Sequence, residues 1–213
     1  MRLLVPFLAL TAALGDVVVV DRIAVIAGKH VIKLSDIDRD LRLTEFLNGE
    51  PLNLTAEKRR QSAERLIDQQ IIRGEVSSGG YTRATDGEAE ALLRQIRRDR
   101  FGAADTKMRA ELSRYGLIED DLRAQLLWQL TVLRFIQQRF QAEVTASDQD
   151  VRTYYNQHLA DLKRQDPANS SFEALAPQIR SALEGEHVNR DFEEWLAGAR
   201  QQTRIEYRQG AFQ

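Results

Sequence analysis

Histidine is the side chain best suited to acid–base chemistry near neutral pH, and it is also a common metal ligand. The chain has three histidines, His30, His158 and His187, scattered over its length. None has a second histidine three or four residues away, the spacing that brings two metal ligands to one helical face. We therefore expect ordinary surface or half-buried histidines, and neither a metal site nor a catalytic base.

Clustered carboxylates could bind calcium, and the segment DIDRD resembles the start of a calcium-binding loop, with acids at Asp36, Asp38 and Asp40. Such a loop needs a glycine at its sixth position for a sharp turn and a glutamate at its twelfth position. These positions hold Leu41 and Leu47. The sequence therefore argues against a calcium site of this type.

Two pairs of adjacent acids, Asp120–Asp121 and Glu193–Glu194, fall in segments that we expect to be helical. Adjacent residues on a helix point about 100° apart, so the two carboxylates of a pair do not converge on a substrate. The chain also lacks cysteine, a glycine-rich nucleotide loop and the G-x-S-x-G motif of serine hydrolases. We predict no catalytic residue, no cofactor and no enzymatic activity.

The composition is that of a globular protein and excludes some partners. Of the 213 residues, 43% are hydrophobic and 29% are charged, which allows a buried core. The 30 basic and 32 acidic residues give a net charge of −2, which argues against a nucleic-acid binder that works through bulk positive charge. Few aromatic residues and four prolines favour long helices over a β-sandwich.

The first 15 residues, MRLLVPFLALTAALG, have the three-part layout of a secretory signal peptide. Arg2 precedes an apolar run over residues 3–14, and Ala13 and Gly15 are the small residues that a signal peptidase recognises before Asp16. The run is shorter than the ~20 residues that span a bilayer. We predict cleavage between Gly15 and Asp16 and a mature protein, residues 16–213, that lies outside the cytoplasm without a stable membrane segment.

The periodicity of the hydrophobic residues indicates where helices and strands lie along the chain. Residues 22–33 alternate as a hairpin around Gly28-Lys29, and Ser35 is expected to cap the helix that follows. Thr55 is expected to cap a second helix that ends at residues 77–80. Further helices are predicted at about 85–101, 106–115, 118–144, 147–158 and 172–202, with a linker at 159–171 and a strand at 203–208.

The helix over 118–144 has an unusually wide apolar arc. Leu122, Leu126, Leu130, Leu133 and Phe140 form one stripe, beside a second stripe of Trp128, Val132 and Phe135. Such an arc is typical of a central core helix, but part of it could line a groove for apolar segments of another protein. The candidate binding residues on this second interpretation are Phe101, Tyr115, Trp128, Val132 and Phe135.

A two-stranded hairpin is only marginally stable by itself in water, so the hairpin at 22–33 needs a partner. The segment TRIEYR at 203–208 alternates as a strand does, and it is the other good candidate in the chain. We therefore predict a mainly α fold with one small antiparallel sheet that joins the two ends of the chain.

Three segments, VDRIAVIAGKHVIKLSDIDRDL, AERLIDQQII and LSRYGLIEDDLRAQL, together with IRSALEGEHVNRDFEEWLAGARQQTRIEYR, resemble the chaperone region of SurA, PrsA and PpiD-like proteins. The resemblance covers about residues 20–208. It implies one chaperone-like domain, in which the N-terminal part, 16–158, is completed by a C-terminal helix and strand, 172–208, that pack back on it.

Many members of that family carry a parvulin-type prolyl isomerase domain between these two parts. Here the segment from Gln157 to Ser170 has 14 residues, whereas a domain with its own core needs at least ~50. We therefore expect no isomerase domain.

The resemblance implies an exported, ATP-independent, periplasmic chaperone for unfolded or nascent exported polypeptides, with outer-membrane proteins in transit as the implied clients. The alternative is a structural or adaptor protein that holds one folded partner on the same scaffold.

Overall fold

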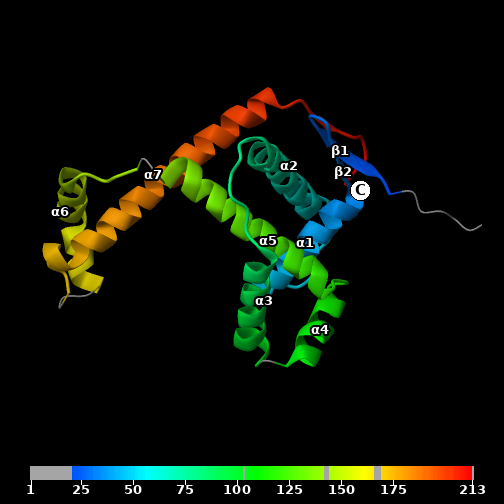
Figure 1. Cartoon of the computed structure of the whole chain (residues 1–213), viewed down its shortest axis with the longest axis horizontal. Coiled ribbons are helices and arrows are strands. Elements are labelled where there is room, and N and C mark those ends of the chain that lie inside the picture. Colours follow the sequence, from blue (N-terminus) through cyan, green and yellow to red (C-terminus); the bar gives the residue numbers. More distant parts are fainter. Residues whose placement is uncertain (1–20, 103, 142–143, 166–168, 213) are drawn as a thin grey trace, which may run out of the picture.

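The computed structural model describes residues 21–102, 104–141, 144–165 and 169–212. These residues form seven α-helices, one π-helical turn and a three-stranded antiparallel sheet (Figure 1). The predicted class, mainly helical with one small sheet, is confirmed. The predicted signal peptide and its cleavage site lie outside the described residues. No helix in the described part of the chain is both long and apolar enough to cross a membrane.

The sheet joins the two ends of the described chain. Strands β1 (Ile23–Ala27) and β2 (His30–Lys33) form the hairpin, and β3 (Ile205–Tyr207) pairs antiparallel with the other edge of β1. Gly28 has a φ of 59°, a conformation that the short turn needs and that glycine adopts without steric cost. The predicted pairing of the hairpin with residues 203–208 is therefore confirmed.

Five helices form the main body together with the sheet. They are α1 (Leu34–Asn48), α2 (Ala56–Ser78), α3 (Asp86–Phe101), α4 (Asp105–Arg114) and α5 (Glu119–Ile136). Of these, α1 and α2 are the ones that pack on the sheet. One core cluster centres on Phe46 and joins α1, α3, α4 and α5, while another lies between the sheet, α1 and α2 around Ile67. The predicted cap of α2 is confirmed, because the Thr55 hydroxyl accepts a hydrogen bond from the backbone N–H of Lys58.

The start of α1 differs from the prediction that Ser35 caps it. Lys33 is the N-cap, and Ser35 lies inside the first helical turn. The Asp36 carboxylate reaches back to accept a hydrogen bond from the backbone N–H of Lys33 at 3.0 Å. Because Asp36 provides this capping interaction, the Ser35 hydroxyl is left to donate to Asp21.

The single helix predicted over 118–144 is interrupted near its end. α5 stops at Ile136, and a π-helical turn, η1 (Gln137–Gln141), follows it. The side chain of Gln138 accepts a hydrogen bond from the backbone N–H of Thr82 at 3.0 Å, and Arg139 pairs with Glu75. The wider turn thus ties the end of α5 to α2 and to the loop that follows α2.

The last two helices, α6 (Asp148–Gln165) and α7 (Phe172–Gln202), extend away from the main body (Figure 1). The linker predicted at 159–171 is wrong over most of its described residues, because α6 continues to Gln165. Ala160, Leu162 and Lys163 are good helix formers, and their propensity outweighs the polar character on which the loop prediction relied.

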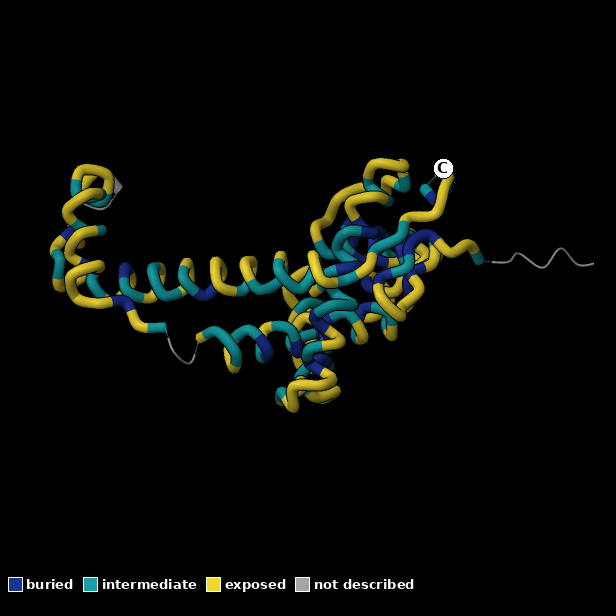
Figure 2. Tube along the Cα trace, turned by 90° about the horizontal axis from the view of Figure 1, so that it is seen from above, coloured by how far each residue is buried: buried dark blue, intermediate teal, exposed yellow. Residues whose placement is uncertain are grey.

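α6 packs against the first half of α7 around Val151 and Ile179, and we call the described residues 146–183 the arm. Figure 2 shows the arm at one end of an elongated molecule, joined to the body by the middle of α7. Nearer its C-terminal end, α7 packs on α5 and η1 through Phe192 and Trp195, and it then leads into β3.

Candidate functional site

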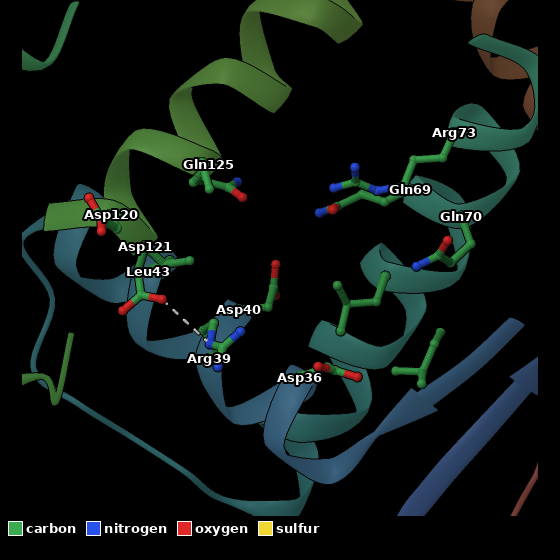
Figure 3. A pocket seen from close by; sticks show the side chains of 13 residues that line it. Asp36, Arg39, Asp40, Leu43, Gln69, Gln70, Arg73, Asp120, Asp121 and Gln125 are labelled. Atoms are coloured by element: carbon green, nitrogen blue, oxygen red, sulfur yellow. Dashed lines mark ion pairs between the residues drawn. The ribbon is translucent and has the colours of Figure 1, made fainter. Parts of the chain in front are cut away.

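A cavity of about 410 Å³ opens between α1, α2 and α5, and Figure 3 shows it from close by. We call it the acidic cavity, because four carboxylates and two guanidinium groups line it. Its lining residues are Ile32 from β2; Asp36, Arg39, Asp40 and Leu43 from α1; Leu66, Gln69, Gln70 and Arg73 from α2; and Asp120, Asp121, Ala124 and Gln125 from α5.

A second cavity of about 420 Å³ lies further along α2 and α5. We call it the Trp128 cavity; it is lined by Arg73, Val76, Ser77, Arg83, Ala84, Ala124, Leu127, Trp128 and Thr131. Both cavities include Arg73 from α2 and Ala124 from α5. The two cavities therefore adjoin each other, and we call them together the α2–α5 groove.

Buried polar contacts fix α1 against α2 and so fix one wall of the groove. Arg59 donates two hydrogen bonds to Asp38, at 2.8 and 3.2 Å. Asp40 is buried and accepts hydrogen bonds from the Ser62 hydroxyl at 2.7 Å and from Arg65 at 2.6 Å. Asp38 and Asp40 of the DIDRD segment therefore hold two helices together.

The other wall, α5, is held by its own cap and by the loop between α2 and α3. The Asp121 carboxylate accepts a hydrogen bond from the backbone N–H of Ile118 at 3.0 Å, at the start of α5. Further along, the buried Thr131 hydroxyl accepts from the backbone N–H of Ala84 at 3.3 Å, and Arg134 donates to the carbonyl of Arg83 at 2.7 Å. The loop is thus bound to α5 and crosses one end of the groove.

Charge is distributed unevenly along the groove. In the acidic cavity, Asp40 pairs with Arg65, Asp120 with Arg123, and Asp121 with Arg39. The Trp128 cavity has no carboxylate among its lining residues, but it has two cations, Arg73 and Arg83. The groove therefore changes from acidic to basic along its length.

Three glutamines line the acidic cavity without an internal partner. The side chains of Gln69 and Gln70 of α2 and of Gln125 of α5 form no hydrogen bond with any other residue that the structure describes. In Figure 3, the side chains of Gln69, Arg73 and Gln125 extend toward one another from opposite sides of the groove. A carboxamide offers both donors and an acceptor, so these side chains can bind a polar ligand of either kind.

Arg73 lies where the two cavities meet. Its guanidinium carbon is 3.8 Å from the centroid of the Trp128 ring, the distance of a close cation–π contact. Desolvation by the neighbouring groups lowers the pKa of Arg73 from its ordinary value, although much of the side chain is open to solvent. The residue is charged at neutral pH and accessible from the groove.

The five residues predicted to bind a partner fall into two separate clusters. Phe101 and Tyr115 pack on Phe46 in the core of the main body, where the Tyr115 hydroxyl donates to the carbonyl of Glu50 at 2.7 Å. The structure therefore does not bring these two aromatic residues to the groove.

Trp128, Val132 and Phe135 lie in another cluster, together with Phe192 and Trp195 of α7. Phe135 has an exposed fraction of 0% and is covered on several sides by aromatic rings, whereas Trp128, with 8%, forms part of the groove wall. Of the five predicted residues, Trp128 is the one that lines the groove.

The prediction missed the polar residues of the groove, above all Gln69, Arg73 and Gln125. Gln69 and Arg73 are four residues apart and so lie on one face of α2. This spacing is visible in the sequence, but the same spacing occurs on any solvated helical face. What distinguishes these residues is that α5 lies opposite them.

Comparison with known proteins shows a sequence similarity. The chain is similar to the chaperone SurA. It is 26% identical to SurA of Pseudomonas fluorescens Pf0-1 and 24% identical to SurA of P. fluorescens Pf-5, in both cases over 188 residues, which cover 82% of this chain and 44% of the relative. SurA of P. putida KT2440 is 26% identical over 146 residues, which cover 67% of this chain and 34% of the relative.

The chain thus spans less than half the length of the SurA proteins that it matches. No family model matches it. At this identity the relationship to SurA is weak, but it extends over most of the chain. It supports a SurA-like protein with a chaperone-like function.

Proposed function

We propose that the protein is an exported, ATP-independent chaperone that holds unfolded or extended polypeptides in the α2–α5 groove. The observation that carries this proposal is the set of unpaired carboxamides, Gln69, Gln70 and Gln125, on the walls of the groove. An extended polypeptide has one unsatisfied donor and one acceptor on the backbone of each residue. Carboxamides can satisfy both, whatever the client sequence is.

Apolar groups lie between these polar ones. Leu43 and Leu66 line the acidic cavity, while Val76, Leu127 and Trp128 line the Trp128 cavity. They offer contact area to apolar client side chains, which an unfolded chain exposes and a folded one buries. Polar groups for the backbone and apolar walls for the side chains suit weak, reversible binding of many sequences.

The place and the clients of this activity are inferred from the sequence. The layout of residues 1–15 supports export to the periplasm, and the similarity to SurA supports client polypeptides in that compartment, with outer-membrane proteins in transit as the proposed clients. No nucleotide-binding motif is present in the sequence, so binding and release are driven by client affinity. We propose no isomerase activity, because the connection between α6 and α7 is too short for a domain.

The test is the suppression of aggregation of an outer-membrane protein that is diluted from urea, measured by light scattering. The purified protein should suppress aggregation. The variant Ala124→Trp, which places a large side chain in both cavities, should lose most of this effect. The matched control Ala91→Trp, at an exposed position on α3, should keep it.

No suppression by the wild-type protein at several-fold molar excess would overturn the proposal. Equal activity of the two tryptophan variants would move binding away from the groove. A pull-down separates the chaperone from the adaptor, because recovery of one stoichiometric folded partner would favour the adaptor.

A further inference from the structure

The Trp128 cavity contains two arginines whose positive charge is not balanced by an ion pair among the described residues. Arg73 and Arg83 both line it, and neither forms an ion pair with any residue that the structure describes. Arg83 donates a hydrogen bond to the Ser77 hydroxyl at 3.3 Å, a neutral partner. The carboxylates of the neighbouring acidic cavity do not supply the missing charge. Asp40, Asp120 and Asp121 pair with other arginines, and Asp36 accepts a hydrogen bond from the backbone N–H of Lys33.

The contact with Trp128 orients Arg73 for a ligand. The guanidinium carbon lies over the indole ring, 3.8 Å from the ring centroid. A guanidinium that contacts an aromatic ring through its face keeps its N–H groups free at its edge. Two parallel N–H donors at that edge match the two oxygens of a carboxylate. The geometry therefore suits a planar anion better than a cation or a neutral amide.

The Trp128 cavity lies at one end of the groove. The loop between α2 and α3 crosses to α5 beside the Trp128 cavity, where Ala84 is hydrogen-bonded to Thr131 and the carbonyl of Arg83 accepts from Arg134. Arg83 and Ala84 of this loop line the Trp128 cavity, so an extended client that runs along the groove from the acidic cavity meets the loop there. A polypeptide that ends here presents either an ammonium or a carboxylate group.

We propose that the Trp128 cavity binds the C-terminal carboxylate of a client polypeptide, with Arg73 as the principal ligand and Arg83 as a second cation. Val76 and Leu127 form the adjacent apolar wall, so the preferred last residue has an apolar side chain. This inference rests on the proposed function, because it places the end of the same client in the same groove. It also gives the bound client a direction, with its C-terminus at the basic end.

The experiment compares three peptides of ten residues that carry fluorescein at the N-terminus, with binding measured by fluorescence anisotropy. The first ends in phenylalanine with a free carboxylate. The second has the same sequence with a C-terminal carboxamide. The third has the carboxamide and an aspartate before the phenylalanine. The wild-type protein should bind the free acid about fivefold more tightly than the other two, which is the size of a favourable ion pair open to solvent.

Two variants test whether the preference for the free acid depends on Arg73. Arg73→Gln should lose most of the preference for the free acid, because only Arg83 then remains at the site. The control Arg152→Gln should keep the fivefold difference, because Arg152 also lies over an aromatic ring, 4.4 Å from the centroid of Phe172, but in the arm. Circular dichroism of each variant verifies that it is folded.

Each of the other outcomes would refute one part of the proposal. Equal affinity of the wild-type protein for the free acid and the carboxamide would overturn the carboxylate site and leave the proposed function intact. An undiminished fivefold difference in Arg73→Gln would overturn the role of Arg73. An aspartate peptide that binds as tightly as the free acid would overturn the assignment to a chain end. Binding of none of the peptides would overturn both the site and the proposed function.

Discussion

Proline at position 206 should break the contact that joins the two ends of the chain. Arg204 and Arg208 flank β3 and lie opposite Gly28 and Ala24. Each of these pairs has a backbone hydrogen bond, at 2.8 and 2.9 Å. Bonded pairs alternate in an antiparallel ladder, so Glu206, which lies opposite Ile26, is bonded as well. Proline has no N–H and would leave the carbonyl of Ile26 without this donor.

The expected cost follows from this single bond. Leaving a buried acceptor unsatisfied costs about 1–3 kcal/mol. For a chain of this size, that corresponds to a melting temperature lower by roughly 2–12 °C. Glu206→Ala is the reference, because it removes the same contacts of Glu206 with Arg204 and Arg208 and keeps the N–H.

Position 207 provides the matched control. By the same alternation, the N–H of Tyr207 points away from β1, toward the free edge of the sheet. Tyr207→Pro compared with Tyr207→Ala should therefore show a much smaller penalty than the pair of variants at position 206. The assay is urea denaturation followed by circular dichroism. Equal proline penalties at the two positions would refute the register, and no penalty at position 206 would refute the stabilising role of β3.

Two further predictions concern α7 and its junction with the sheet. Desolvation, followed by the hydrogen bond to Glu64, raises the pKa of Tyr207 to about 12. Because the folded state favours the protonated phenol, the contribution of this group to stability should be complete below pH 10 and lost as the pH rises toward 12. Urea denaturation of the wild type and of Tyr207→Phe over pH 9–12 measures this contribution. Identical pH profiles of the two proteins would refute the prediction. Gly185 lies within α7 with open space around the position of a Cβ, so Gly185→Ala should stabilise the protein by about 0.5–1 kcal/mol, and destabilisation in the same assay would show that the space is needed.

The sequence was informative where local chemistry decides the structure. Gly28 in a two-residue turn predicted the hairpin, and Thr55 predicted the start of α2; both are local signals. The pairing of β3 with β1 is not local. It followed because a hairpin needs a third strand and the alternating segment at 203–208 was the other good candidate in the chain.

The sequence was less informative where two side chains compete or where a distant element decides. Ser35 and Asp36 can both satisfy the free donors at the start of α1, and Asp36 does so. Gln69 and Arg73 look like residues of a solvated helical face until α5 is placed opposite them. Phe135 was a candidate for the groove from its place on the apolar arc, but α7 covers it with Trp195. Each of these outcomes depends on tertiary packing, which periodicity does not report.

The sheet also determines when the molecule can finish folding. β1 belongs to the first described residues and β3 to the last, so their pairing closes a loop of nearly the whole chain. Contacts of such high sequence separation form late, because the entropy of loop closure must be overcome first. Until β3 arrives, one edge of β1 remains open to pairing with other chains. A chain in which β3 is not yet paired therefore exposes a strand edge, the kind of surface that its groove is proposed to protect in others.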